Sequence, residues 1–150
     1  MIKLNLPEYA YKLSKVEGRI MIFDPLRKKH LVLTPEEWVR QHFVNYLVTE
    51  LKYPKALIRL EGGLSYNQLQ KRSDIVVFDR DAKPWMVIEC KAPDQILSNE
   101  TLHQASTYNA TLRAKFLVVT NGLSHFFFST DWSSGVVQSL NDLPTYPGSL

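Results

Sequence analysis

Residues 72–93 of the chain read RSDIVVFDRDAKPWMVIECKAP, and this stretch decides how the rest of the sequence is interpreted. Its apolar runs 75–78 and 85–88 flank the polar residues 80–83. Strand-forming runs on either side of a polar turn predict a β-hairpin, and Pro84 is expected to close the turn.

The register of this hairpin brings two acids together. A loop of residues 80–83 puts Asp79 opposite Pro84, and counting outward puts Asp74 opposite Glu89. Paired residues in a hairpin share a face, with their Cβ atoms ~5 Å apart. We therefore expect the two carboxylates to be neighbours at the open end of the hairpin.

Side chains alternate along the second strand, so Lys91 lies on the face of Glu89 while Cys90 points into the core. Two opposed carboxylates repel each other unless one is protonated, a cation lies between them or both splay into water. Mg²⁺ takes oxygen ligands, often from only one or two protein carboxylates. The spacing fits such a metal site. It also fits a solvated strand end, because a slip of one residue in the register separates the acids.

Asp74, followed fifteen residues later by Glu89-Cys90-Lys91 on the next predicted strand, resembles the core of PD-(D/E)xK nucleases. The neighbouring motifs are more specific. Over residues 30–130 they resemble the N-terminal nuclease domain of type I restriction enzyme R subunits, through Lys71–Val77, Ile88–Pro93, Gln104 with Tyr108, and Thr120-Asn121-Gly122. The resemblance implies an α/β fold, a mixed sheet flanked by helices with a restriction-endonuclease-like core.

The resemblance also implies roles for individual residues. Asp74, Glu89 and the backbone carbonyl of Cys90 would bind Mg²⁺, for which Mn²⁺ would substitute. Lys91 would orient the attacking water or stabilise the developing charge. Several families of this superfamily carry a glutamate on the first helix that approaches the metal, and Glu37 matches that position.

A helix is predicted over residues 35–51, with Thr34 as N-cap, proline at the first helical position and acids near the positive end of the helix dipole. Glu37 has two interpretations. It lies in line with the buried face and so approaches the metal, or it completes a capping box with Thr34. Glu36 is the weaker metal candidate, because it lies in line with Arg40 instead.

A second helix is predicted over residues 98–113, with Gln104 and Tyr108 on one face, turned toward the sheet. By itself this pair indicates only a helix with one aromatic residue in the core. After an ExK strand, it resembles the QxxxY motif of RecB-like nucleases, which helps to hold the active site and the nucleic-acid backbone. Arg72 shares the face of Asp74, where it either contacts phosphate or lowers the pKa of the acid.

The remaining chain is expected to add strands around this core. They are predicted over residues 20–23, 30–33, 56–60, 115–120 and 124–129. The apolar run 115–120 is typical of a strand covered on both faces, and Asn121-Gly122 predicts a tight turn after it. Residues 131–135 are predicted to be a loop, and the proline-containing tail to be irregular.

Composition narrows the class of protein. The 150 residues suffice for one domain, 1–150, and a hydrophobic content of 45% excludes a disordered chain. A net charge of +3 permits DNA as a partner without requiring it. One cysteine, no signal-peptide pattern and no apolar run of membrane-spanning length indicate a cytoplasmic protein with no membrane contact. Gly62-Gly63 lacks the spacing of an ATP-binding P-loop, so translocation would require a separate motor or specificity subunit.

These observations predict a Mg²⁺-dependent DNA endonuclease of the PD-(D/E)xK type, related to restriction or DNA processing. Two alternatives stay open. In the first, the chain is a nuclease-fold module that binds DNA or serves in assembly without turnover of its own. In the second, it is an α/β protein that binds a small ligand, and the D…ExK pattern is accidental. DNA binding without cleavage under any metal favours the first, and Asp74 and Glu89 on opposite faces of the sheet favour the second.

Overall fold

The computed structural model describes residues 1–60 and 74–147. The strands in these residues are β1 Leu13–Val16, β2 Arg19–Asp24, β3 Lys29–Val32, β4 Ile58–Leu60, β5 Ile75–Phe78, β6 Pro84–Cys90, β7 Phe116–Thr120, β8 His125–Asp131 and β9 Val136–Leu140. The helices are α1 Pro35–Thr49 and α2 Asn99–Leu112, with a short 3-10 helix η1 at Lys55–Leu57.

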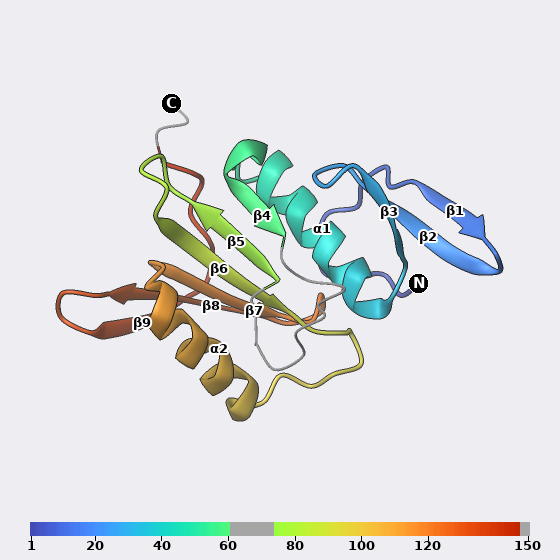
Figure 1. Ribbon diagram of the computed structural model, residues 1–150. Coiled ribbons are helices and arrows are strands. Elements are labelled where there is room, and N and C mark those ends of the chain that lie inside the picture. The colour runs from blue at the N-terminus through green and yellow to red at the C-terminus, as the bar shows by residue number, and fades with distance from the viewer. Residues whose placement is uncertain (61–73, 148–150) are drawn as a thin grey trace.

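These strands form two sheets (Figure 1). The smaller sheet is an antiparallel meander in the order β1-β2-β3, and the larger has the order β4-β5-β6-β7-β8-β9. In the larger sheet β6 and β7 run parallel, whereas the other described pairs are antiparallel. Helix α2 makes the crossover that parallel pairing requires. The predicted mixed sheet flanked by helices is confirmed.

Helices α1 and α2 lie on opposite sides of the larger sheet (Figure 1). The apolar run of β7 divides between these two layers, as expected of a strand covered on both faces. Its residues Phe116 and Val118 pack in the core beneath α1, whereas Leu117 and Val119 pack beneath α2. The α1 core also contains Cys90, whose side chain is fully buried, as the alternation along the strand predicts.

The β5–β6 hairpin keeps the predicted register at its open end and departs from it at its turn. Ile75 pairs with Ile88, which continues to Asp74 beside Glu89. At the other end Pro84 faces Phe78, so the expected pairing of Asp79 with Pro84 is wrong. The cause is a β-bulge between Val77 and Phe78, because a bulge places two residues of one strand opposite one of the other.

Both long helices begin where the capping residues predict. The hydroxyl of Thr34 accepts a hydrogen bond from the Glu37 backbone N–H, and Ser98 accepts one from Thr101 in the same way. These bonds satisfy backbone donors that have no partner within a helix. Helix α2 ends at Arg113, which adopts the left-handed conformation with φ +57°.

Two strands lie where no strand is predicted from the sequence. Strand β1 (LSKV) and strand β9 (VVQSL) both lie at sheet edges and are largely exposed. Residues 136–140 were expected to belong to an irregular tail, and that expectation is wrong. An exposed edge strand does not need the apolar alternation by which a half-buried strand is identified, so periodicity does not find it.

The turn between β7 and β8 is built from the predicted Asn121-Gly122 pair. The Asn121 carboxamide oxygen accepts from the N–H groups of Leu123 and Ser124, and its Nδ2 donates to the Gln95 carbonyl. The turn is therefore tied to the segment that follows β6. Gly122 has φ +86°, a conformation that glycine adopts without steric cost.

Gly122→Ala is expected to lower the free energy of unfolding by about 2–4 kcal/mol. A Cβ there lies 2.8 Å from Leu4 Cδ2 and 3.1 Å from Val39 Cγ2, in addition to the backbone strain. Gly18→Ala is the matched control, because Gly18 has φ +80° and a Cβ there meets nothing within 4 Å. Urea denaturation measures both. Equal losses in the two variants would show that close packing against Leu4 and Val39 does not contribute.

Candidate active site

The predicted site residues gather where β5 begins and β6 ends. Asp74 directly precedes β5, Glu89 and Cys90 end β6, and Lys91 follows. The backbone N–H of Lys91 donates to the Thr120 carbonyl at 2.8 Å, which holds the chain against the end of β7. The sheet thus fixes the backbone positions of the D…ExK pattern.

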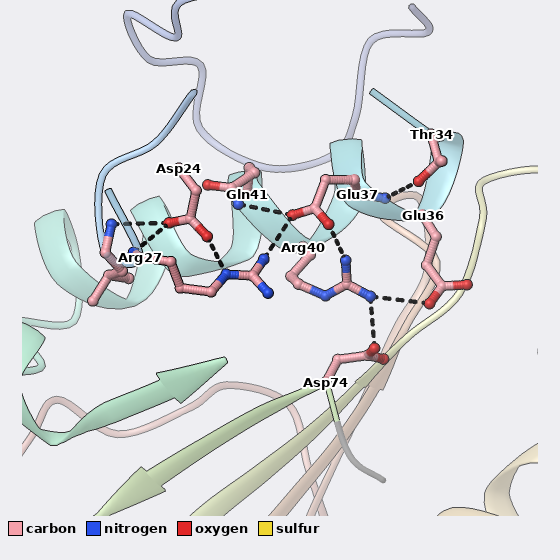
Figure 2. A network of polar contacts seen from close by, with 9 residues as sticks. Asp24, Arg27, Thr34, Glu36, Glu37, Arg40, Gln41 and Asp74 are labelled. Atoms are coloured by element: carbon pink, nitrogen blue, oxygen red, sulfur yellow. Dashed lines mark hydrogen bonds and ion pairs between the residues drawn. The ribbon is translucent and has the colours of Figure 1, made fainter. Parts of the chain in front are cut away.

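Asp74 is buried, and both of its carboxylate oxygens are engaged. Oδ1 accepts a hydrogen bond from Arg40 Nη2 at 2.7 Å, and Oδ2 accepts one from the Cys90 backbone N–H at 2.7 Å. Helix α1 and strand β6 therefore hold the same carboxylate from two sides. Figure 2 shows the contact from Arg40. This orientation is set by tertiary contacts, since Arg40 lies 34 residues away in the chain.

Glu89 and Lys91 form an ion pair beside Asp74. Lys91 Nζ lies 3.4 Å from Glu89 Oε2, and each side chain is 19% exposed. The two side chains are two residues apart on an extended segment and so emerge on one face. Unlike Asp74, they remain accessible to a ligand from solvent.

Behind Asp74 runs a chain of buried ion pairs. Arg40 Nη1 donates to Glu37 Oε1, while Arg27 Nη2 donates to Glu37 Oε2 at 3.4 Å. Arg27 Nε in turn donates to Asp24, a residue with no exposed surface. Figure 2 shows acid and guanidinium alternating from Asp24 to Asp74 along α1. The chain connects the end of β2 to the start of β5.

The two helix glutamates have different surroundings. Glu37 is 4% exposed and bonded to Arg27, Arg40 and Gln41. Its backbone N–H donates to the Thr34 hydroxyl, which is one half of a capping box. Its carboxylate accepts from these three side chains instead of from the Thr34 backbone N–H, so the other half is not made. Figure 2 shows Arg40 between Glu37 and Asp74.

Glu36 faces the site more directly than its neighbour. Its carboxylate accepts from Arg40 Nη2 at 3.0 Å, the same nitrogen that bonds Asp74. Burial and next the Asp74 charge raise the pKa of Glu36, against the opposing effects of Arg40 and Lys91. Glu36, the weaker candidate from sequence, is thus the α1 acid whose charge is coupled to both Asp74 and Lys91.

The electrostatics of Arg40 and Cys90 follow from the same cluster. Burial acts to lower the pKa of Arg40, but the Asp74 and Glu37 carboxylates more than offset it, so its pKa lies above the ordinary value. Burial, and after it Asp74, raise the pKa of the Cys90 thiol. Arg40 is therefore a permanent cation, and Cys90 is a neutral core residue.

Gln104 and Tyr108 both lie on α2. Tyr108 is half-buried against the core beneath α2, as predicted. Gln104 is exposed, and its Nε2 lies 3.5 Å from Glu100 Oε1, so the expectation that it faces the sheet is wrong. Their angular offset on the helix places only Tyr108 against the sheet. Arg72, the predicted phosphate contact, lies outside the described residues.

The donor chemistry at this edge of the sheet suits a hard divalent cation. Asp74, Glu89 and Glu36 supply carboxylate oxygens, which Mg²⁺ and Mn²⁺ prefer. Burial raises the pKa of Glu36, and the neighbouring Asp74 charge raises it further. Within residues 1–60 and 74–147, no three His, Cys, Asp or Glu side chains already converge as metal ligands. The oxygen ligands are therefore of the kind that such an ion binds. In this structure, the cation in contact with Asp74 is Arg40.

Sequence reasoning missed Arg40 and Asp24. Arg40 follows Glu36 by four residues and Glu37 by three, a spacing typical of exposed ion pairs on a helix. Only its place among the buried residues of α1 could have signalled another role, since an arginine in the apolar stripe requires a buried acid as partner. Asp24 had no such signal, because an acid before Pro25 reads as a turn residue.

None of the helices in the described parts of the chain combines the length and apolar character needed to span a bilayer.

Comparison with known protein families identifies the family of this chain. The family described as Type I restriction enzyme R protein N terminus matches residues 35–144. Among solved structures, a fragment described as an HsdR subunit of a type I restriction enzyme from Vibrio vulnificus YJ016 is 30% identical, with a TM-score of 0.38. That match covers 59% of this chain and 16% of the other. A search of curated proteins found no match. The family match spans most of the chain, from α1 through β9, and the protein therefore belongs to the N-terminal family of type I restriction enzyme R proteins.

Proposed function

We propose that the protein is a metal-dependent DNA endonuclease of the PD-(D/E)xK type. One observation carries the proposal. Asp74 and the Glu89-Lys91 ion pair stand at the same end of two adjacent antiparallel strands, with a permanent cation bonded to Asp74. Acids held together in this way need compensating positive charge, and a divalent ion supplies it in a hydrolytic site.

Asp74, Glu89 and the Cys90 backbone carbonyl would hold Mg²⁺ or Mn²⁺, with Glu36 within reach of the same charge cluster. When bound, the ion lowers the pKa of a coordinated water and neutralises phosphate charge. Lys91 stands beside Glu89 with Nζ partly exposed, so it can orient the attacking water or hold the developing negative charge. Glu37 would act indirectly, by holding the Arg40 side chain that contacts Asp74.

DNA is the proposed substrate, with Arg72, Gln104 and Tyr108 the proposed backbone contacts. Gln104 is exposed on α2 and so is placed to meet a ligand that Tyr108, half-buried, only supports. Residues 1–150 carry no ATP-binding P-loop, so any translocation along DNA would come from a motor outside these residues.

A cleavage assay tests the proposal. Supercoiled plasmid and single-stranded DNA are incubated with the purified protein and Mg²⁺ or Mn²⁺, and with EDTA in a parallel series. We expect nicking or degradation with metal and none in EDTA. Cleavage that persists in EDTA would exclude the proposed chemistry.

A module that binds DNA without turnover is the second candidate, and one observation favours it. Arg40 Nη2 donates to Asp74 Oδ1 at 2.7 Å, and this oxygen would otherwise be open to a metal ion. DNA binding measured by fluorescence anisotropy, together with no cleavage under Mg²⁺, Mn²⁺ or any added motor subunit, would support this candidate against the nuclease.

A further inference from the structure

Arg40 makes contacts that a simple surface ion pair does not. Arg40 is 2% exposed, and its guanidinium reaches three carboxylates, those of Glu36, Glu37 and Asp74. Its Nε is buried without a hydrogen-bond partner in the described part of the chain. A buried arginine normally satisfies all of its donors, so this side chain is held by charge more than by a complete set of hydrogen bonds.

We propose that Arg40 is a positioning residue that holds Asp74 in the metal-free site, and that it gives up Asp74 Oδ1 when the site is loaded. The inference rests on the proposed function, because it takes Asp74 as a metal ligand. It adds a residue to which the family resemblance gives no role.

The charges of the cluster explain why such a cation is needed. Asp24, Glu36, Glu37 and Asp74 are linked to the guanidinium groups of Arg27 and Arg40, four carboxylates against two cations. Among the described residues, Arg40 Nη2 is the donor that bridges Asp74 and Glu36, so its removal leaves the two acids without that bridge. An uncompensated buried carboxylate is strongly unfavourable, so Asp74 requires a positive charge beside it, from Arg40 in the metal-free site or from a bound metal.

The geometry also shows how Arg40 can release Asp74 without leaving the site. Its Nη1 is bonded to Glu37, which Arg27 and Gln41 hold in place from the other side. Only Nη2 is shared between Asp74 and Glu36. Arg40 can therefore keep Glu37, pass Nη2 wholly to Glu36 and free Asp74 Oδ1. A lysine has a single nitrogen, so it cannot keep one nitrogen on Glu37 while a second nitrogen moves from Asp74 to Glu36.

The wild-type protein permits a direct test by NMR of ¹⁵N-labelled arginine side chains. In the metal-free protein, Arg40 should give a protected guanidinium signal, identified by its loss in Arg40→Lys. Titration with Mg²⁺ should shift this signal in step with metal binding, whereas the Arg27 signal should stay within its linewidth. Mn²⁺ binding, followed independently by EPR, reports whether the site loads.

The two readouts separate the possible failures. Metal that binds at Asp74, shown by its loss in Asp74→Asn, while the Arg40 signal is unchanged would overturn this inference and leave the nuclease proposal intact. A protein that binds no metal at any concentration would overturn both.

A matched pair of variants gives a second test. Arg40→Gln removes the cation but keeps an amide donor for Asp74, and we expect Mn²⁺ to bind about fivefold more tightly or better, since a competing charge is gone. Arg27→Gln removes a guanidinium that does not touch Asp74 in the described contacts, and its affinity should change less than about twofold. Equal or weaker Mn²⁺ binding in Arg40→Gln than in Arg27→Gln would contradict displacement. If Arg40→Gln does not fold, the wild-type NMR titration decides.

Discussion

Asp74→Asn is expected to reduce metal-dependent DNA cleavage by about 10³-fold or more, because loss of a metal-ligand charge costs several kcal/mol of transition-state stabilisation. Lys91→Met should lower the rate by about 10²–10³-fold, since it removes one charge-stabilising group and leaves the carboxylates in place. The measurement is the initial rate of plasmid nicking at saturating Mg²⁺, with the unfolding midpoint recorded for each variant.

Lys83→Met is the matched control for Lys91. Lys83 lies in the exposed turn at the opposite end of the same hairpin, so its loss should leave nicking within about twofold of wild type under the same salt. If Lys91→Met nicks DNA as fast as Lys83→Met, Lys91 has no part in the chemistry. Cleavage by folded Asp74→Asn at the wild-type rate would place the active site elsewhere.

Glu37→Ala is expected to lower the free energy of unfolding by about 3–5 kcal/mol, the cost of removing one partner from a buried ion pair. The Glu37 side chain is 5% exposed, and its carboxylate contacts the guanidinium groups of both Arg27 and Arg40. Without it, the buried Arg40 and the partly buried Arg27 both lose an acid partner. Urea denaturation in the absence of metal measures the loss.

Glu36→Ala is the control for this prediction, because the two glutamates are adjacent on α1 and both bond Arg40. The Glu36 side chain is 46% exposed, and we expect its removal to change stability by less than about 1 kcal/mol. Similar losses in the two variants would show that the buried network does not stabilise the fold. A loss for Glu37→Ala that appears only with metal present would mean that Glu37 acts as a ligand instead.

The sequence predicted the central hairpin and both long helices because their signals are local. Apolar runs on either side of a polar turn located β5 and β6, and Thr34 and Ser98 marked the helix starts. The bulge that moved Pro84 opposite Phe78 leaves no mark in apolar periodicity. Edge strands β1 and β9 escaped for a related reason, since neither buries an apolar face.

The candidate site was predictable for the residues that a motif marks and not for those that support them. Asp74 and Glu89 follow from the hairpin register, because pairing at Ile75 and Ile88 extends to them. The bond from Arg40 to Asp74 joins residues 34 apart, and no periodicity encodes it. Helical spacing from Glu37 predicted a face but could not show that Arg40 stands between Glu37 and Asp74.

Crystals of the protein soaked in Mn²⁺ test the central claim most directly, by the position of the anomalous scattering peak. We predict a peak within ligand distance of the Asp74 and Glu89 carboxylates, with Arg40 Nη2 moved from Asp74 toward Glu36. Well-diffracting crystals with these carboxylates ordered and no peak between them, at Mn²⁺ concentrations that support nicking in solution, would contradict the account.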